Sequence, residues 1–275
     1  MSEGHWQLEG TAAELYERYL VPAITTKWAE DLLERAQPRE GEAVLDTACG
    51  TGIVARLAAK RIGRGKVTGL DLNSGMLAVA RSVPTEGVSI SWIEGSALDL
   101  PFRSGSFDVV LCQLGLQFFP DQRKALGEIR RVLKASGRAA LSVYSQIERT
   151  PGANAFVLAM DDVLGRDASR IKRGEHSFAD PTQLETLLRD SGFNAVDVHI
   201  VEQLIVFPSV LDYVRFQLLA TPMTVLLKDQ TEPQREAIIA AIASKTMALS
   251  RPAMLAGGRF IFPQQAYVAI AQSSR

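Results

Sequence analysis

An acidic residue followed by a glycine-rich turn is the part of the chain best suited to bind a nucleotide. Residues 44–52 read Val-Leu-Asp-Thr-Ala-Cys-Gly-Thr-Gly, and a helix-like run follows over residues 53–61. The apolar pair can end a buried strand, the glycines let a ligand approach the backbone, and the helix N-terminus offers free N–H groups. A strand, a tight turn and a helix in this order predict a cradle for a nucleotide.

Two classes of nucleotide are compatible with this turn. Gly50 to Ala55 matches the dinucleotide pattern G-x-G-x-x-A, with Asp71 about 20 residues further on, which keeps an NAD(P)-dependent oxidoreductase open as an alternative. Asp46, directly before the turn, would repel a diphosphate but suits a ligand that carries positive charge there. S-adenosylmethionine carries a sulfonium and an ammonium group and no phosphate, so Asp46 favours it over NAD.

The elements that must position these residues follow the same strand-and-turn plan. Residues 66–71 read as a second strand that ends in Asp71, where a carboxylate can accept both ribose hydroxyls. Residues 89–94 and 107–112 read as further strands, which run into loops at Gly95 and Gln113. Alternating strands and helices over residues 41–145 predict a doubly wound parallel sheet.

These motifs together resemble class I S-adenosylmethionine-dependent methyltransferases, and in style the ubiquinone/menaquinone type that acts on small molecules. The resemblance covers residues 40–145 well and rests on residues 46–52, Asp71, residues 95–102, Phe107-Asp108, and residues 131–137. It implies an α/β fold with a doubly wound, mostly parallel seven-stranded, Rossmann-like sheet. It also implies transfer of a methyl group to the oxygen, nitrogen or carbon of a small acceptor.

The resemblance implies a set of residues that bind the cofactor. Asp71 would hold the ribose hydroxyls, Leu72 and Met76 would lie beside the adenine, and Gln113 would lie under the methionine part. The full set is Tyr19, Asp46, Thr47, Ala48, Cys49, Gly50, Gly52, Asp71, Leu72, Met76, Gly95, Ser96, Ala97, Leu98, Gln113, Leu114 and Gln117.

Three positions depart from the family pattern. Ser96 stands where relatives often have an Asp for the adenine amine, and Gln117 stands where many have a His. Residues 134–137 replace the usual Pro-Gly-Gly turn. The change at Gln117 removes a possible base.

Two residues are candidates for a catalytic role. His176 lies in an expected loop next to Glu175 and near Asp180, which could orient its ring, and Tyr144 ends the fifth expected strand. A loop-stabilising role for His176 and a packing role for Tyr144 are the simpler alternatives. Methyl transfer from a sulfonium chiefly requires alignment in a site closed to water, so we expect catalysis mainly by proximity and orientation.

The chain divides into three expected parts. Residues 1–40 form a helical cover, with one helix ended by Pro22 and a second over residues 24–36. Residues 41–208 and 257–275 form the cofactor-binding core. Residues 209–256 form a helical cap between the last two strands, and its apolar side chains, Phe216 among them, suggest an apolar or aromatic acceptor.

Composition limits the possible partners. The 275 residues are 47% hydrophobic and carry a net charge of -1, which gives no general attraction to nucleic acid or to an anionic membrane. Cys49 and Cys112 lack metal-ligand spacing, so we expect no metal and two reduced thiols in a cytoplasmic protein. We expect no membrane insertion and a monomer or homodimer; a non-catalytic subunit that binds S-adenosylmethionine stays open as a third alternative.

Overall fold

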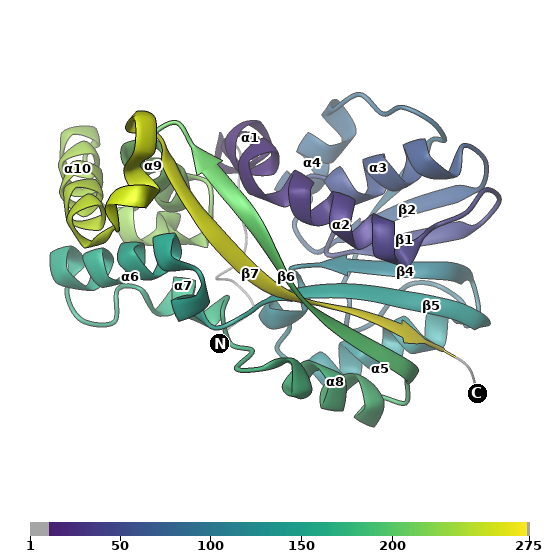
Figure 1. Cartoon of the computed structure of the whole chain (residues 1–275). Helices are drawn as coiled ribbons and strands as arrows, with labels where there is room; N and C mark the ends of the chain where they lie inside the picture. The colour runs from purple at the N-terminus through teal and green to yellow at the C-terminus, as the bar shows by residue number, and fades with distance from the viewer. Residues whose placement is uncertain (1–10, 274–275) are drawn as a thin grey trace.

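A seven-stranded sheet with helices on both faces organises residues 11–273, the part of the chain described by the computed structural model (Figure 1). The strand order is β3-β2-β1-β4-β5-β7-β6, and within these residues β7 is the strand that runs antiparallel to its neighbours. The strands are β1 (Ala43–Thr47), β2 (Lys66–Asp71), β3 (Ile90–Glu94), β4 (Phe107–Gln113), β5 (Leu133–Tyr144), β6 (Asn194–Phe207) and β7 (Phe260–Gln272). The predicted doubly wound, mostly parallel sheet is confirmed.

The central strands are covered on both faces, which is why they read as apolar runs rather than as alternating ones. Val44 of β1 faces a core that includes helices α2 (Thr26–Ala36) and α3 (Ile53–Ile62). Leu45, its neighbour, faces the second core with α5 (Gln122–Val132) and α8 (Pro181–Asp190). Helix α4 (Ser74–Ser82) joins β2 to the β3 edge, and Asn73 caps it by accepting a hydrogen bond from the Met76 N–H.

The last two strands extend beyond the sheet and carry the predicted helical segment at their far end (Figure 1). Strand β5 pairs with residues 266–272 of β7, whereas β6 pairs along β7 as far as Phe260. The intervening helices are α9 (Val210–Leu219), η5 (Pro222–Leu227), α10 (Glu232–Leu249) and η6 (Pro252–Gly258), and α10 packs against α6 (Pro151–Leu164) and α9. The ring of Tyr213 on α9 packs this helical segment against β6 and β7. Its centroid lies 5.1 to 5.4 Å from the ring centroids of Phe207 on β6 and of Phe260 and Phe262 on β7.

The N-terminal helix runs past Pro22, so the prediction that Pro22 ends it was wrong. Elements α1 (Thr11–Leu15), η2 (Tyr16–Thr25) and α2 follow one another without a break, and η2 is π-helical. The wider π-helical turn moves backbone partners by one residue, which accommodates a ring that lacks an N–H. The Thr26 hydroxyl donates to the Val21 carbonyl at 2.9 Å and helps to satisfy that carbonyl.

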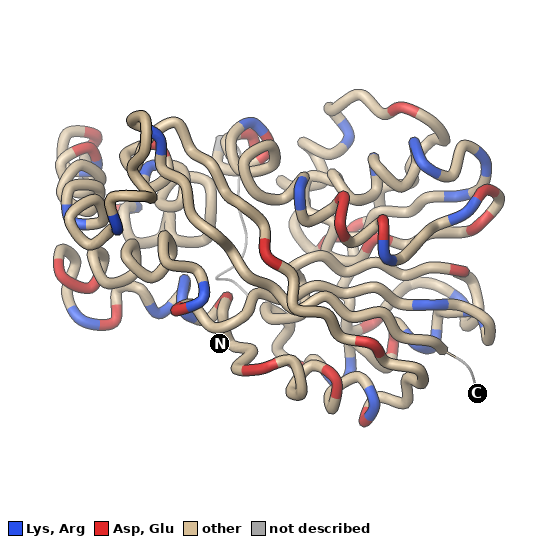
Figure 2. Tube along the Cα trace, viewed as in Figure 1, with Lys and Arg blue, Asp and Glu red and all other residues tan. Residues whose placement is uncertain are grey.

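Shorter elements connect the remaining parts. They are η3 (Leu116–Phe118), η4 (Ile147–Arg149) and α7 (Arg170–Gly174), and α7 lies where the sequence indicates only a loop. Lys and Arg positions are interspersed with Asp and Glu positions along the chain trace, and no extended run of one sign is seen from this side (Figure 2). Among residues 11–273, no helix is long and apolar enough to cross a membrane. The same residues hold no cluster of three or more potential metal ligands.

Candidate functional site

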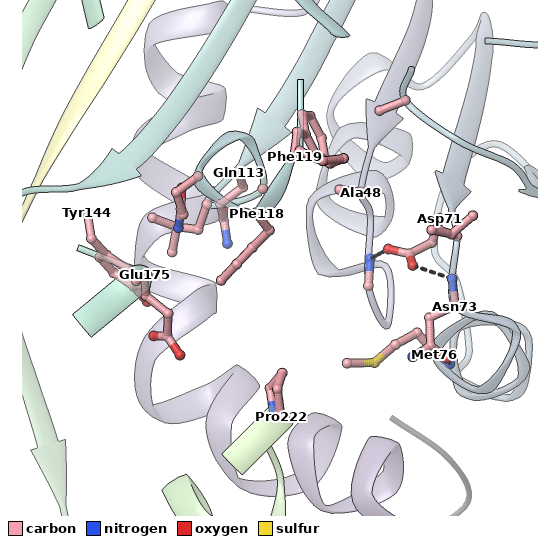
Figure 3. Close-up of a pocket in the computed structure, with 18 of the residues that line it drawn as sticks. Ala48, Asp71, Asn73, Met76, Gln113, Phe118, Phe119, Tyr144, Glu175 and Pro222 are labelled. Atoms are coloured by element: carbon pink, nitrogen blue, oxygen red, sulfur yellow. Dashed lines mark hydrogen bonds between the residues drawn. The ribbon is translucent and has the colours of Figure 1, made fainter. Parts of the chain in front are cut away.

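A cavity of about 890 Å³ opens at the carboxyl edge of the parallel strands. Its wall comes from the turns after β1, β2, β3 and β4, from the end of β5, and from the helical elements η2, α7, α9 and η5. Figure 3 shows two separated groups of polar side chains, with Asp71 and Asn73 at one end and Tyr144 and Glu175 at the other. This is the edge at which ligands bind in doubly wound folds.

Asp71 organises the first end of the cavity. Its carboxylate accepts hydrogen bonds from the backbone N–H of Gly50 at 2.7 Å and from that of Asn73 at 2.8 Å (Figure 3). Burial raises the pKa of Asp71, and these N–H groups act against that shift. Gly50 has φ +55° and open space where a Cβ would lie, so its backbone is accessible to a ligand. The hydrogen bond from Gly50 thus joins the end of β2 to the glycine-rich turn after β1.

Asp46 lies behind this turn rather than on the wall of the main cavity. It is buried, it accepts a hydrogen bond from the Ala55 N–H of α3 at 3.0 Å, and burial raises the pKa of its carboxyl well above the usual range. It lines a separate pocket of about 40 Å³, together with Cys49 and Gln113. Its visible role is therefore to join β1 to the start of α3.

Three more residues of the predicted cofactor set do not line the main cavity. The Thr47 hydroxyl donates to the Leu111 carbonyl at 2.9 Å, and Cys49 is buried beside the turn. Gly52 has φ +89°, and a Cβ there would lie 2.3 Å from the Trp92 ring. Gly52 thus serves packing and the turn, not ligand access.

The loops after β2 and β3 supply a neighbouring part of the wall. Leu72, which is 51% exposed, and Met76 line the cavity, and their contact with an adenine stays a prediction. The Ser96 hydroxyl accepts a hydrogen bond from the Leu98 N–H at 3.1 Å and so shapes the turn after β3. The remaining predicted wall residues that the cavity includes are Ala48, Gly95, Ala97, Leu98 and Leu114.

Two buried amides lie between the ends. Gln113 donates from Nε2 to the Thr25 carbonyl at 3.1 Å, while its Oε1 has no partner among residues 11–273. Gln117 has neither amide atom paired within the same described range. Because buried polar atoms are normally hydrogen-bonded, both amides are suited to contact a ligand in the cavity.

The opposite end of the cavity holds a buried ion pair that the sequence motifs did not reveal. Lys172 Nζ lies 2.5 Å from Glu175 Oε2, and both side chains are less than one tenth exposed. Glu175 points into the open space beside Tyr144 (Figure 3). Gln217 and Tyr16 also line the cavity, and Tyr16 in addition lines the small pocket beside Asp46 and Gly50. A Lys and a Glu three residues apart in a charged segment match no functional motif. Their place on the cavity wall is therefore visible only in the tertiary structure.

His176 does not line the main cavity. Its Nδ1 lies 2.7 Å from the Ser145 carbonyl, and its ring stacks on Tyr144 with centroids 4.9 Å apart. Burial, with a further contribution from Lys172, lowers the pKa of His176 to about 3. Asp180, expected to orient the ring, instead caps α8 by accepting from the Gln183 N–H. His176 therefore supports Tyr144 from behind as a neutral side chain.

Tyr19 also lies away from the cavity wall, because its ring stacks on Phe216 with centroids 3.9 Å apart and an angle of 11°. Tyr16, one turn earlier, lines the cavity in its place. The sequence placed both tyrosines on a covering helix, but the π-helical turn decides which of them faces inward.

Comparisons with known proteins agree with this geometry. The model of the ubiE/COQ5 methyltransferase family matches residues 19–206. A demethylmenaquinone methyltransferase of Listeria monocytogenes serotype 4a is 33% identical over 187 residues, which are 63% of this chain and 78% of that protein. The match ends before the helical segment that starts at α9.

Solved structures share the fold. A Bacillus halodurans protein superposes with a TM-score of 0.57 at 20% identity, covering 90% of this chain and 99% of that one. A Haemonchus contortus phosphoethanolamine N-methyltransferase, solved with S-adenosylhomocysteine, gives 0.56 at 18% identity over 90% of this chain and 53% of that one. The resemblance found in the motifs is confirmed: the chain belongs to the ubiE/COQ5 methyltransferase family and is an S-adenosylmethionine-dependent methyltransferase that acts on a small molecule.

Proposed function

We propose that this enzyme methylates a small aromatic acceptor that carries a hydroxyl group, of the quinol class. The observation that carries the proposal is the make-up of the end of the cavity remote from Asp71. Aromatic and aliphatic side chains surround a few polar groups there, a composition typical of sites for small apolar ligands. Tyr144 lies at this end (Figure 3), and the other apolar and aromatic residues of the wall outside the turns after β1, β2 and β3 include Tyr16, Leu20, Ile24, Phe118, Phe119 and Pro222. The Listeria monocytogenes relative is named a demethylmenaquinone methyltransferase, which also supports an acceptor of the quinone type.

We assign the Asp71 end of the cavity to the cofactor. Gly50 leaves open space where a Cβ would lie, and Asn73 Nδ2 and Gln113 Oε1 are buried without partners in the described part of the chain. These features suit a nucleoside with a polar amino-acid tail. In this assignment Asp71 accepts from the ribose hydroxyls, and Leu72, Met76 and the turn at residues 95–98 contact the adenine.

The proposed reaction depends mainly on alignment. S-adenosylmethionine supplies an already activated methyl group. The residues of η2 and α9 cover part of the cavity over the strand edge, which limits the access of water, while the aromatic wall orients the acceptor ring toward the cofactor end. Phe118 and Phe119, between the two ends in Figure 3, are placed to hold the ring plane.

The experiment that tests this proposal has two parts. Calorimetry should give binding of S-adenosylhomocysteine and none of NAD. Turnover on a panel of phenols, naphthalenediols, amines and sugars, followed by mass spectrometry of the methylated product, should favour the hydroxylated aromatic members. Normal S-adenosylhomocysteine binding with turnover of amines alone would contradict the acceptor class while leaving the cofactor assignment intact.

The remaining expectations from the sequence stay proposals. We retain the three-part division into a cover, a core and a helical cap, a monomer or homodimer, no nucleic-acid partner and a cytoplasmic location. Both cysteines are free and buried, which supports the expected reduced state. Size-exclusion chromatography with light scattering tests the oligomeric state.

A further inference from the structure

The Lys172–Glu175 pair is the feature that the alignment mechanism leaves unexplained. Both side chains are buried on α7 and the residue that follows it, and both line the cavity. Removing two charges from water is costly, and a hydrophobic pair of similar volume is often at least as stable. A buried ion pair on a cavity wall is therefore better explained by contact with a ligand than by stability.

The carboxylate of Glu175 has capacity for one more partner. Its Oε2 is engaged by Lys172, whereas no side chain or backbone donor among residues 11–273 reaches its Oε1. Gln217, which is buried and also lines the cavity, has an Oε1 without a partner in the described range. Figure 3 shows the Glu175 carboxylate directed into the open space between Tyr144 and Pro222. A hydroxyl placed there would donate to the free oxygen of Glu175.

No other acid or base on the described wall is as well placed. Asp121 caps α5 by accepting a hydrogen bond from the Lys124 N–H. Asp71 is engaged by two backbone N–H groups at the far end, and Asp46 lies behind the turn. His176 faces the Ser145 carbonyl rather than the cavity. The phenols of Tyr16 and Tyr144 stay protonated because burial raises the pKa of both, so neither offers an ionised oxygen to accept the proton.

We propose that Glu175, held in place by Lys172, is the catalytic residue that takes the proton from the acceptor hydroxyl. This inference rests on the proposed function. The acceptor O–H bond breaks, its proton moves to the free oxygen of Glu175, and its electron pair stays on the acceptor. The acceptor anion then bonds to the methyl carbon while the carbon–sulfur bond breaks and its electron pair neutralises the sulfonium. Glu175 finally returns the proton to water.

The test uses Glu175→Gln, which keeps the size of the side chain and removes the base. The probe is a dihydroxynaphthalene, assayed anaerobically at saturating S-adenosylmethionine from about pH 6.5 to about pH 9.5, where phenols begin to ionise without help. The single variant leaves Lys172 buried without a partner and can be unstable for that reason. The double variant Glu175→Gln/Lys172→Met removes both charges and replaces it in that case. Glu185→Gln is the matched control, since Glu185 is a partly exposed glutamate of α8 that pairs with Arg189 and does not line the cavity.

We expect kcat at about pH 6.5 to fall by about 100-fold to 10,000-fold in the Glu175 variants, the usual contribution of a general base. The affinity for S-adenosylhomocysteine should not change, and the deficit in kcat should shrink at least tenfold at the upper pH because the acceptor ionises by itself. The ionisable groups that face Glu175 are Lys172 of α7, Tyr16 of η2, Tyr144 of β5 and Tyr213 of α9. All four are present in both the wild type and Glu175→Gln, so a difference between the two pH profiles reports on Glu175.

Two results would overturn the inference. One is a kcat within about threefold of the wild type at every pH, since a general base contributes far more. The other is a deficit of the same size at all pH values, which would show a positioning role only. If the wild type binds S-adenosylhomocysteine but methylates no hydroxylated probe, the acceptor class fails and the role of Glu175 fails with it.

Discussion

The two ends of the cavity are built in different ways. At the cofactor end, Asp71 binds the N–H groups of Gly50 and Asn73, so backbone groups of two adjacent turns form the wall. At the acceptor end, side chains from η2, β5, α7 and α9 converge, with the Lys172–Glu175 pair among them. The first end depends on backbone conformation and the second on the packing of helices, so substitutions should affect them by different mechanisms.

The two ends of the cavity also differ in how completely the family match covers them. The family match covers the strands and turns of the cofactor end and also most of η2, the end of β5 and α7 at the acceptor end, but it stops at residue 206, before α9 and the elements that follow it. Those elements contribute Gln217, Thr221 and Pro222 to the acceptor end. A change of acceptor therefore requires new side chains on helices rather than a new cofactor turn.

Gly52→Val should produce the largest effect and act on the fold. The φ of +89° is unfavourable for a branched residue, and a Cβ would lie 2.3 Å from the Trp92 ring. We expect a loss of about 3 kcal/mol or more in the free energy of unfolding, measured by urea denaturation. Gly50→Ala is the matched control, since its Cβ meets nothing within 4 Å: it should stay folded and weaken S-adenosylhomocysteine binding. Equal stability of the two variants would contradict the distinction between the two glycines.

Asp71→Ala should affect the cofactor end alone. The carboxylate holds both turns, and its loss removes charge-assisted hydrogen bonds and leaves two N–H groups unpaired. We expect about 1.5–3 kcal/mol weaker binding of S-adenosylhomocysteine by calorimetry. Asp197→Ala, an exposed position on β6, is the control and should bind normally. Unchanged affinity in Asp71→Ala would remove this residue from the cofactor site.

His176 should make the acceptor end sensitive to acid. Its pKa is about 3 in the folded protein and 6.5 without burial, so the unfolded chain binds the proton more strongly. This contribution to stability is complete above pH 6.5 and is lost as the pH falls toward 3, by about 2 kcal/mol between pH 6.5 and pH 4.5. Urea denaturation at several pH values should show a smaller acid dependence in His176→Gln than in the wild type and in the surface control His199→Gln. The same acid dependence in all three proteins would rule out this role.

Phe216→Ala should have the smallest effect and act on the acceptor end. The ring stacks on Tyr19 and fixes the covering helix against α9. We expect a loss of about 1 kcal/mol of stability and a rise of roughly threefold to tenfold in the acceptor KM, with little change in S-adenosylhomocysteine affinity. Leu211→Ala, an exposed position on the same helix, is the control. Equal losses in acceptor and cofactor affinity would indicate a general folding role for Phe216 instead.

The sequence was sufficient for the sheet and for the pairing of the glycine turn with the end of the next strand, because these are encoded by contiguous segments. A strand, a turn and a helix between Val44 and Arg61 specify the cradle, and Asp71 follows at the end of the next strand. The sequence did not separate residues that face the ligand from residues that support the turn, so Asp46 and Gly52 were placed on the wall. Their neighbours Ala55 and Trp92 contact them only in the folded chain.

The acceptor end was harder to predict because its residues have no common motif. Histidine is the usual candidate for a base, which directed attention to His176, yet one residue earlier Glu175 is the side chain that reaches the cavity. The choice between Tyr16 and Tyr19 depends on a π-helical turn around Pro22, which ordinary helical periodicity does not anticipate.

The most direct measurement of the two-ended site is a crystal structure of the enzyme with S-adenosylhomocysteine and a dihydroxynaphthalene. We predict both ribose hydroxyls within about 3 Å of the Asp71 carboxylate, and a naphthalene hydroxyl at hydrogen-bond distance from Glu175. The sulfur should then face the acceptor ring across the middle of the cavity. A nucleoside bound beside Tyr144 and Glu175, with the acceptor near Asp71 or outside the cavity, would contradict the assignment of the two ends.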